Sequence, residues 1–176
     1  MTITRFAPAA LTAALCASLA ATATAQQDRM DDALSAAPTF ITDGATVTDW
    51  DGTVLREGTN GWTCMPTPPD LPGNAPMCVD ATFASLTRAW QSRETPTYDG
   101  VGVAYMLAGD AGASNSDPFA MSPEGVDDWV VAGPHLMIVV PDPSVLATFN
   151  TDPSRGPWVM WKNTPYTHVM VPVAEE

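Results

Sequence analysis

The chain has 176 residues, of which twenty are acidic and seven basic, and its formal net charge at pH 7 is −13. Such a surface repels the phosphates of nucleic acids and of anionic lipids, so neither class of partner is expected. The length suits a single domain with a hydrophobic core of its own.

The first 25 residues have the pattern of a secretory signal peptide. Arg5 gives the positive charge near the N-terminus, residues 7–20 form an apolar run, and Ala23-Thr24-Ala25 offers the small side chains that signal peptidase requires. The apolar run is too short to span a membrane, and no later stretch is long enough. The sequence therefore predicts cleavage after Ala25. It also predicts one exported domain, residues 26–176, that is periplasmic or extracellular and has no integral membrane segment.

Two cysteines, Cys64 and Cys78, remain in the predicted mature chain. An even number of cysteines in an exported protein predicts a disulfide, which here contributes about 3 kcal/mol or less because prolines already stiffen the loop. A thiolate metal site or a redox pair is the alternative, but the spacing is neither C-x-x-C nor typical of zinc. The third cysteine, Cys16, lies in the predicted signal peptide, where its lipidation is an alternative to cleavage after Ala25.

The N-terminal part of the predicted domain combines a short helix with a hairpin. Residues 28–36 suit one or two helical turns, which Pro38 ends. Two β-prone runs, residues 45–50 and 53–57, flank Asp51-Gly52. An Asp-Gly pair between such runs is a strong signal for a β-hairpin.

The clearest helix is predicted over residues 80–93. Asp80 is a suitable N-cap, and apolar side chains follow at the three- and four-residue spacing of one helical face. Those side chains are Phe83, Leu86 and Trp90. We therefore expect this helix to bury all three against a sheet.

Four β-prone runs follow the helix: residues 102–107, 135–140, 158–161 and 168–171. The last two predict a closing hairpin, in which alternation would place Trp158 and Trp161 on opposite faces. Residues 109–134, between the first two runs, form a long irregular connection of the kind that is often functional. These elements together predict an α+β fold, with a mostly antiparallel sheet, one main amphipathic helix packed on it, and one disulfide.

Several segments of the chain resemble those of a group of exported bacterial single-domain proteins of unassigned function. The segments are DWDGTVLREGTNGWTC, PMCVD, SNSDPFA, GPHLMIVVPDP and PWVMWKNTPYTHVMVPV. The resemblance covers nearly the whole predicted mature chain. It implies export and a single domain, and it carries over no catalytic residue.

The two histidines occur in the same local pattern, His-x-Met, within predicted strands: His135 with Met137 and His168 with Met170. Period-2 geometry puts the histidine and the methionine of each pair on one face. If the two strands are neighbours, opposed side chains lie about 5 Å apart and diagonal ones about 7–8 Å apart. Two imidazoles and two thioethers converging on one ion would favour copper, particularly Cu(I), over magnesium or calcium.

Two further methionines, Met106 and Met160, lie in other predicted strands and would be able to add a ligand to such a site. The alternative interpretation is purely structural. Methionine fills irregular core space, and a histidine in an apolar strand is often held in place by a hydrogen bond.

The segment 109–118 is a second candidate site. Ser114 or Ser116 could act as a nucleophile with His135 or His168 as its base. The segment contains neither a G-x-S-x-G nor an S-x-x-K pattern, however, and Ser, Asn and Asp commonly bond their own backbone in turns. Ordinary turn chemistry is therefore the favoured interpretation.

From these observations we expect a binding domain rather than an enzyme. Its most specific ligand would be copper, held by His135, Met137, His168 and Met170. The alternatives are an envelope hydrolase that uses the 109–118 segment with a histidine base, and a protein-interaction or structural module without a small ligand.

Signal-peptide cleavage gives the first testable prediction. Intact-mass measurement of the exported protein should find a chain that begins at Gln26, with or without cyclisation of this residue to pyroglutamate. A mass increment of lipid size on Cys16 would instead show that the chain is processed as a lipoprotein.

Overall fold

The computed structural model describes residues 23–173. The expected signal peptide, residues 1–25, therefore lies almost entirely outside the described residues. Residues 23–34 are helical, which agrees with a helix before Pro38. Within the described range, no helix is long and apolar enough to cross a membrane.

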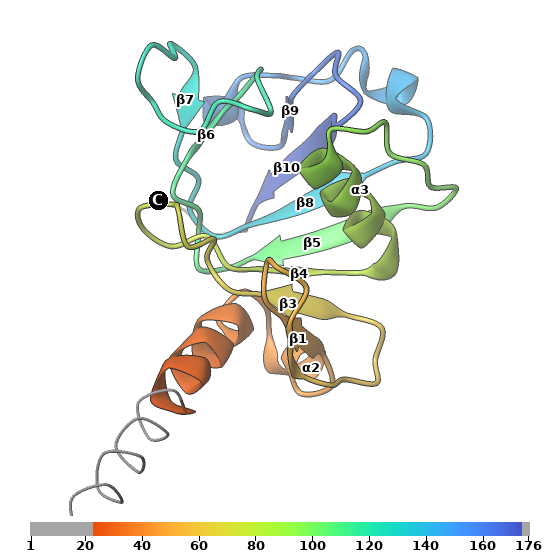
Figure 1. The fold of residues 1–176 in the computed structure, drawn as a ribbon. Coiled ribbons are helices and arrows are strands. Elements are labelled where there is room, and N and C mark those ends of the chain that lie inside the picture. Colours follow the sequence, from red (N-terminus) through yellow and green to blue (C-terminus); the bar gives the residue numbers. More distant parts are fainter. Residues whose placement is uncertain (1–22, 174–176) are drawn as a thin grey trace, which may run out of the picture.

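An eight-stranded sheet in the order β2-β1-β3-β4-β5-β8-β10-β9 runs through the molecule (Figure 1). All neighbouring strands pair antiparallel except β1 and β3, which are parallel. The expected α+β fold with a mostly antiparallel sheet is thus confirmed. The strands are β1 (Thr46–Thr48), β2 (Val54–Arg56), β3 (Thr63–Met65), β4 (Met77–Val79), β5 (Gly102–Met106), β8 (His135–Val139), β9 (Trp158–Met160) and β10 (His168–Pro172).

The predicted hairpin and the predicted disulfide both lie at the β2 end of the sheet. β1 and β2 pair antiparallel, and Gly52 in their turn has a φ of 87°, a conformation that glycine adopts without strain. Cys64 and Cys78 are bonded, and they are directly opposed in the register of β3 and β4. The disulfide therefore closes the base of the loop over residues 66–76.

Helix α3 (Ala81–Ser92) confirms the predicted main helix. The Asp80 carboxylate caps it by accepting a hydrogen bond from the Phe83 amide at 2.7 Å, and it also accepts one from the Val103 amide at 2.8 Å. One side chain therefore begins the helix and ties it to β5. Phe83 and Leu86 are buried as expected, but Trp90 is only half-buried, because it borders an open pocket rather than the closed core.

Two glycines allow close approaches between elements. A Cβ atom on Gly102 would lie 2.6 Å from the Phe83 amide nitrogen, so α3 can pack directly on β5 only with glycine there. A Cβ atom on Gly112 would lie 2.2 Å from the Trp129 indole nitrogen, and the φ of Gly112 is 100°. Glycine is therefore required where the Trp129 ring packs on the loop.

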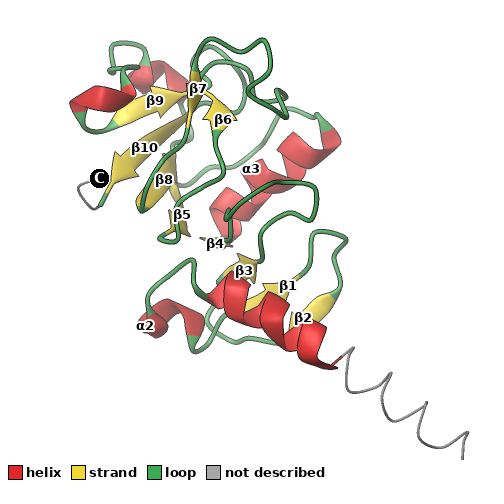
Figure 2. Ribbon diagram, turned by 90° about the vertical axis from the view of Figure 1, so that its left-hand side faces the viewer, coloured by secondary structure: helices red, strands yellow, loops and turns green. Residues whose placement is uncertain are grey.

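The two faces of the sheet are covered differently (Figures 1 and 2). The α3 face, which carries Ala104, Met106 and Met137, is buried under α3 and the connection after β5. On the opposite face, the helix at 23–34 and α2 (Thr39–Thr42) cover the β1 end. The 3-10 helix η1 (Pro143–Leu146) contributes to a separate small cluster near β9 and β10.

The connection from residue 109 to residue 134 is irregular, as expected, apart from a two-stranded pairing of β6 (Ala113–Ser114) with β7 (Trp129–Val130). The closing hairpin is confirmed by the antiparallel pairing of β9 with β10, and a short 3-10 helix, η2 (Pro153–Arg155), precedes it.

The expectation that Trp158 and Trp161 face opposite sides of the sheet is wrong. β9 ends at Met160, and Trp161 has a φ of 54°, so strand alternation does not continue to this residue. Both tryptophans consequently pack with the core on the α3 face.

The packing of α3 predicts unequal effects of two substitutions. Phe83 is 2% exposed, so Phe83→Ala should lower the free energy of unfolding by about 3–5 kcal/mol. Trp90→Ala should cost clearly less, because part of its ring already faces the pocket. Urea denaturation of both variants measures the difference, and equal losses would place Trp90 in the closed core.

Candidate functional site

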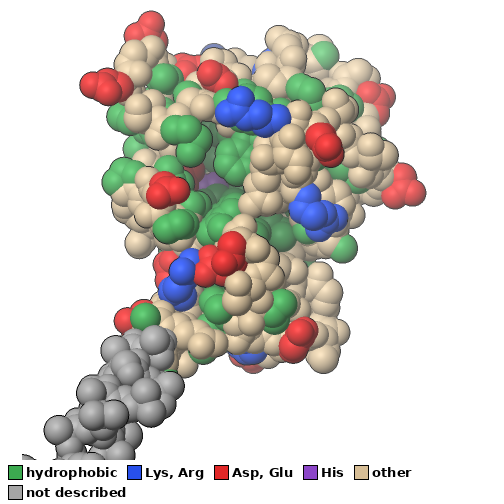
Figure 3. All heavy atoms as spheres, in the orientation of Figure 1, with side chains coloured by type: hydrophobic (Ala, Val, Ile, Leu, Met, Phe, Trp, Pro, Cys, Tyr) green, Lys and Arg blue, Asp and Glu red, His purple; other side chains and the backbone are tan. Residues whose placement is uncertain are grey.

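A pocket opens in the α3 face, over the centre of the sheet. Its floor is formed by β5, β8, β9 and β10, and its walls by α3, the disulfide-closed loop and the 109–121 segment. Its empty volume is about 990 Å³, including the part that opens to solvent. Figure 3 shows apolar side chains around this hollow and histidine atoms at its bottom.

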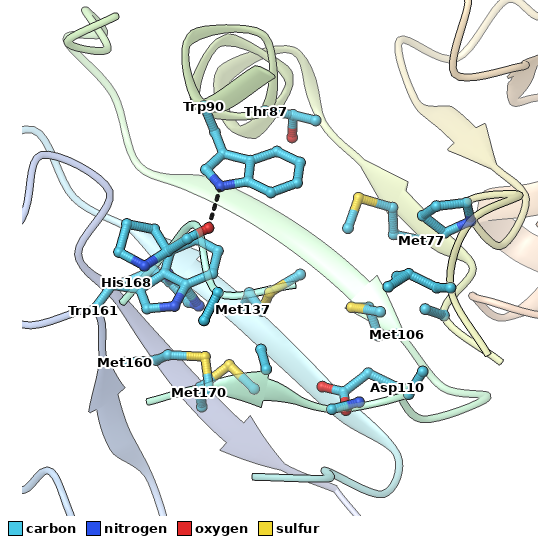
Figure 4. Close-up of a pocket in the computed structure, with 18 of the residues that line it drawn as sticks. Met77, Thr87, Trp90, Met106, Asp110, Met137, Met160, Trp161, His168 and Met170 are labelled. Atoms are coloured by element: carbon cyan, nitrogen blue, oxygen red, sulfur yellow. Dashed lines mark hydrogen bonds between the residues drawn. The ribbon is translucent and has the colours of Figure 1, made fainter. Parts of the chain in front are cut away.

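Methionine and tryptophan dominate the lining (Figure 4). The methionines are Met77, Met106, Met121, Met137, Met160 and Met170. The tryptophans are Trp50, Trp90, Trp129 and Trp161. Most of the polarisable side chains of the chain thus gather around one cavity, where they give an apolar but adaptable surface.

The strand register explains why the methionines and histidines share this face. Directly opposed residues of paired strands point to the same side of a sheet. His168 on β10 is opposite Met160 on β9, and Met170 on β10 is opposite Met137 on β8. The two His-x-Met strands are therefore neighbours with their pairs on one face, which is the condition that the metal hypothesis set.

The register also separates the two histidines. His135 is opposite Pro172, which lies four residues from His168 along β10. At about 3.4 Å per residue, the two positions are roughly 14 Å apart along the strand. His135 instead lies directly opposite Met106 on β5. The four predicted ligands therefore fall into two groups rather than one.

Each group contains a histidine, the methionine two residues later on the same strand, and a methionine directly opposite the histidine. One group is His168, Met170 and Met160, and the other is His135, Met137 and Met106. We call them the His168 triad and the His135 triad. All three members of the His168 triad line the pocket, whereas His135 does not.

Both imidazoles are held in one orientation by the backbone. Nδ1 of His135 lies 2.7 Å from the Gly133 carbonyl oxygen, and Nδ1 of His168 lies 2.9 Å from that of Tyr166. Because a carbonyl only accepts, each Nδ1 donates, and in the neutral ring the lone pair is on Nε2. A histidine that binds a metal through one ring nitrogen commonly donates the N–H of the other to a backbone carbonyl, which fixes the orientation of the ring.

The Nε2 atoms of His135 and His168 have no hydrogen-bond partner. Both residues are 1% exposed, and among residues 23–173 these two atoms are the buried side-chain nitrogen or oxygen atoms without one. A buried polar atom left unsatisfied costs about 1–3 kcal/mol. Two ring nitrogens are therefore kept in the core without a partner, at a measurable cost in stability.

Burial also sets the protonation state of His168. Desolvation lowers the pKa of its imidazole from 6.5 to about 4, and repulsion from His135 acts in the same direction. The hydrogen bond to Tyr166 opposes this shift without reversing it. At neutral pH the buried Nε2 of His168 is thus an unprotonated electron-pair donor on a side chain that lines the pocket.

Asp110 lies between the pocket and His135. Its Oδ1 accepts hydrogen bonds from the amides of Gly112 and Ala132, and its Oδ2 lies 3.9 Å from the His135 Nε2. Burial raises the pKa of the Asp110 carboxyl, while the two amides and His135 counteract part of that effect. The 3.9 Å separation is too long for a direct hydrogen bond.

The serines of the 109–118 segment are engaged in turn chemistry. The Ser114 hydroxyl donates to Asp128 at 2.8 Å and accepts from the amides of Ser116 and Asp117. Ser114 is 1% exposed, and the hydrogen bonds of its hydroxyl do not include a histidine. The Ser114 hydroxyl is therefore not paired with either His135 or His168.

The sequence identifies both histidines and the methionine two residues after each. It does not show that Met160 lies opposite His168 or that Met106 lies opposite His135. Those assignments depend on strand register. The expectation that Trp90 is buried is wrong, because helical periodicity shows which face is apolar and not whether that face is covered.

No protein-family model, curated protein or solved structure matches this chain. Within residues 23–173, there is also no group of three or more His, Cys, Asp or Glu side chains that could hold a metal ion. The methionine sulfurs are the soft donors that remain beside the two histidines.

The depressed pKa of His168 predicts a pH-dependent stability. Between about pH 6.5 and 4, the unfolded chain binds a proton at His168 that the folded chain does not. The free energy of unfolding should therefore fall as the pH decreases through this window, by roughly 3 kcal/mol in total. Urea denaturation at several pH values, for wild type and His168→Gln, tests this. Parallel pH profiles of the two proteins would contradict it.

Proposed function

We propose that this protein is an exported binding domain and that the His168 triad binds a soft metal ion, Cu(I). The observation that carries the proposal is the buried Nε2 lone pair of His168, which has no partner and lies on the same face as two methionines. Thioether sulfur and neutral imidazole together suit Cu(I) better than hard cations such as magnesium or calcium.

The spacing of the triad is compatible with one ion. Directly opposed residues such as His168 and Met160 have Cβ atoms about 5 Å apart, and the diagonal pair of Met160 and Met170 about 7–8 Å. Flexible methionine side chains can close these distances to metal–ligand lengths of roughly 2.0–2.3 Å, by analogy with nitrogen and sulfur donors to zinc. The site therefore needs changes of side-chain rotamer and no movement of the strands.

The surroundings also suit a singly charged soft ion. The Trp161 ring centroid lies 4.9 Å from that of His168, so aromatic surface closes one side of the triad. All three ligands are uncharged when they bind, so Cu(I) keeps its single positive charge, and the carboxylates of Asp110 and Asp117 border the same pocket. The pocket gives the ion a route to the triad from solvent.

The His135 triad is a second candidate for the same ion. Its Nε2 is likewise buried without a partner, and Asp110 adds an oxygen donor 3.9 Å away. Two donor atoms that each lie about 2.1 Å from the same ion are roughly 3–4 Å from each other. The 3.9 Å between His135 Nε2 and Asp110 Oδ2 is therefore wide enough for one ion. Because His135 does not line the pocket, we propose that the His168 triad fills first.

Export is part of the proposal. The disulfide between Cys64 and Cys78 is compatible with an oxidising compartment. The hydrolase alternative loses support because Ser114 is occupied by turn hydrogen bonds. An interaction module without a small ligand would leave both free Nε2 atoms without a role.

Titration with Cu(I) against a competing chelator tests the site. We expect one high-affinity ion per chain in the wild-type protein, weakened at least about tenfold by Met160→Leu and by Met170→Leu, since each substitution removes a sulfur and roughly conserves volume. The matched control is Met65→Leu, because Met65 is buried in the same core but does not line the pocket. Its affinity should equal that of wild type.

The pH dependence of the titration adds an independent readout. Because the pKa of His168 is about 4, protons should compete with Cu(I) only near and below that pH. Binding that is unchanged in both leucine variants, or a wild-type protein that takes no Cu(I) from the chelator, would contradict the proposal.

A further inference from the structure

Three of the four tryptophans that line the pocket donate their indole N–H groups to backbone carbonyls. The N–H groups of Trp50, Trp90 and Trp161 donate to the carbonyl oxygens of Pro66, Pro118 and Ser114, at 2.6, 2.8 and 2.9 Å. The Thr87 hydroxyl donates to the Phe83 carbonyl. These donors are therefore used within the protein, as Figure 4 shows for the Trp90 indole.

The acceptors in the pocket are satisfied only in part. The Nε2 of His168 has no partner, and the carboxylates of Asp110 and Asp117 border the cavity while accepting backbone amide hydrogen bonds at Oδ1. Among residues 23–173 no lysine or arginine lines the pocket, and the nearby Arg93 guanidinium lies over the Phe119 ring, 4.6 Å from its centroid. A ligand here is thus favoured when it donates a hydrogen bond and disfavoured when it carries a negative charge.

The aromatic rings and thioethers of the lining favour a flat, apolar ligand. The rings of Trp90 and Trp161 lie within 12° of parallel, so they present aromatic surface in one orientation. Six methionines complete the lining, and their thioethers make favourable contacts with aromatic rings. The cavity volume of about 160 Å³ is similar to the roughly 150 Å³ that holds one benzene ring, and the side open to solvent leaves room for a second fused ring.

From these observations we propose that the pocket binds a planar aromatic small molecule that bears one hydroxyl or amine donor and no negative charge. The donor group bonds to the His168 Nε2, and the rings pack against Trp90 and the thioethers. This activity goes beyond the proposed metal site and requires no metal, since it rests on the apolar pocket and the unpartnered Nε2 of His168. That one lone pair serves either the ligand or the ion, so the two exclude each other at this atom.

Three matched probes test the ligand class: 2-naphthol, naphthalene and 2-naphthoate. Calorimetric titration of the exported chain is carried out with a copper chelator and EDTA present, so that the protein is metal-free. We expect 2-naphthol to bind about tenfold more tightly than naphthalene, which corresponds to one hydrogen bond to a buried acceptor, and 2-naphthoate to bind most weakly. Equal affinities for all three, or tightest binding of 2-naphthoate, would overturn the proposal.

Two variants locate the binding. His168→Leu should remove the preference for 2-naphthol over naphthalene while naphthalene still binds, because only the acceptor is lost. Ala120→Trp, on the pocket wall, should fill the cavity and abolish binding of both probes. It serves as the independent test if the buried His168 variant does not fold, and unchanged binding in Ala120→Trp would overturn the proposal.

The metal-free conditions separate this inference from the metal site. Binding of 2-naphthol to the metal-free protein supports the pocket activity whether or not the wild-type protein binds copper. Failure of copper binding in the wild type leaves the probe experiment unaffected, because it is carried out without metal.

Discussion

The arrangement of the site depends on the register of four adjacent strands, β5, β8, β10 and β9. This register places Met106 opposite His135, Met137 opposite Met170, and Met160 opposite His168. A shift by one residue in any pairing would move a histidine or a methionine to the other face. The pocket floor is therefore fixed by backbone hydrogen bonds of the sheet, and its chemistry follows from which residues those bonds bring side by side.

The two histidines lower the stability of an otherwise apolar core. Each is fixed by a backbone carbonyl at Nδ1 and left without a partner at Nε2, where a leucine would have avoided the cost of desolvation. Structural histidines in a core usually have both ring nitrogens satisfied, because unsatisfied buried polar atoms are rare in folded proteins. A free lone pair at the floor of an open pocket is the arrangement that a ligand or a metal ion would complete.

The walls of the pocket come from segments that contribute little to the sheet. The disulfide between Cys64 and Cys78 closes the loop that carries Leu71 and Ala75, and the segment after β5 folds back over the opposite side. Asp110 and Ser114 hold that segment through hydrogen bonds to nearby backbone amides. The sheet thus provides the polar and sulfur atoms of the site, while the irregular segments decide how much of it is open.

The sequence by itself determined the main helix, six of the eight strands of the large sheet and the residue types of the site, whereas β3 and β4 lie outside the predicted strands. The Asp-Gly turn, the Asp80 cap, the cysteine pair and the His-x-Met alternation depend on local chemistry, and each indicated the structure observed. The tertiary structure alone decided which strands are neighbours and in what register, because pairing depends on contacts between residues far apart in the chain. For that reason one predicted group of four ligands became two triads. For the same reason, the exposure of Trp90 is known only from the folded chain. The same holds for the position of Trp161, whose left-handed backbone conformation ends the alternation of β9.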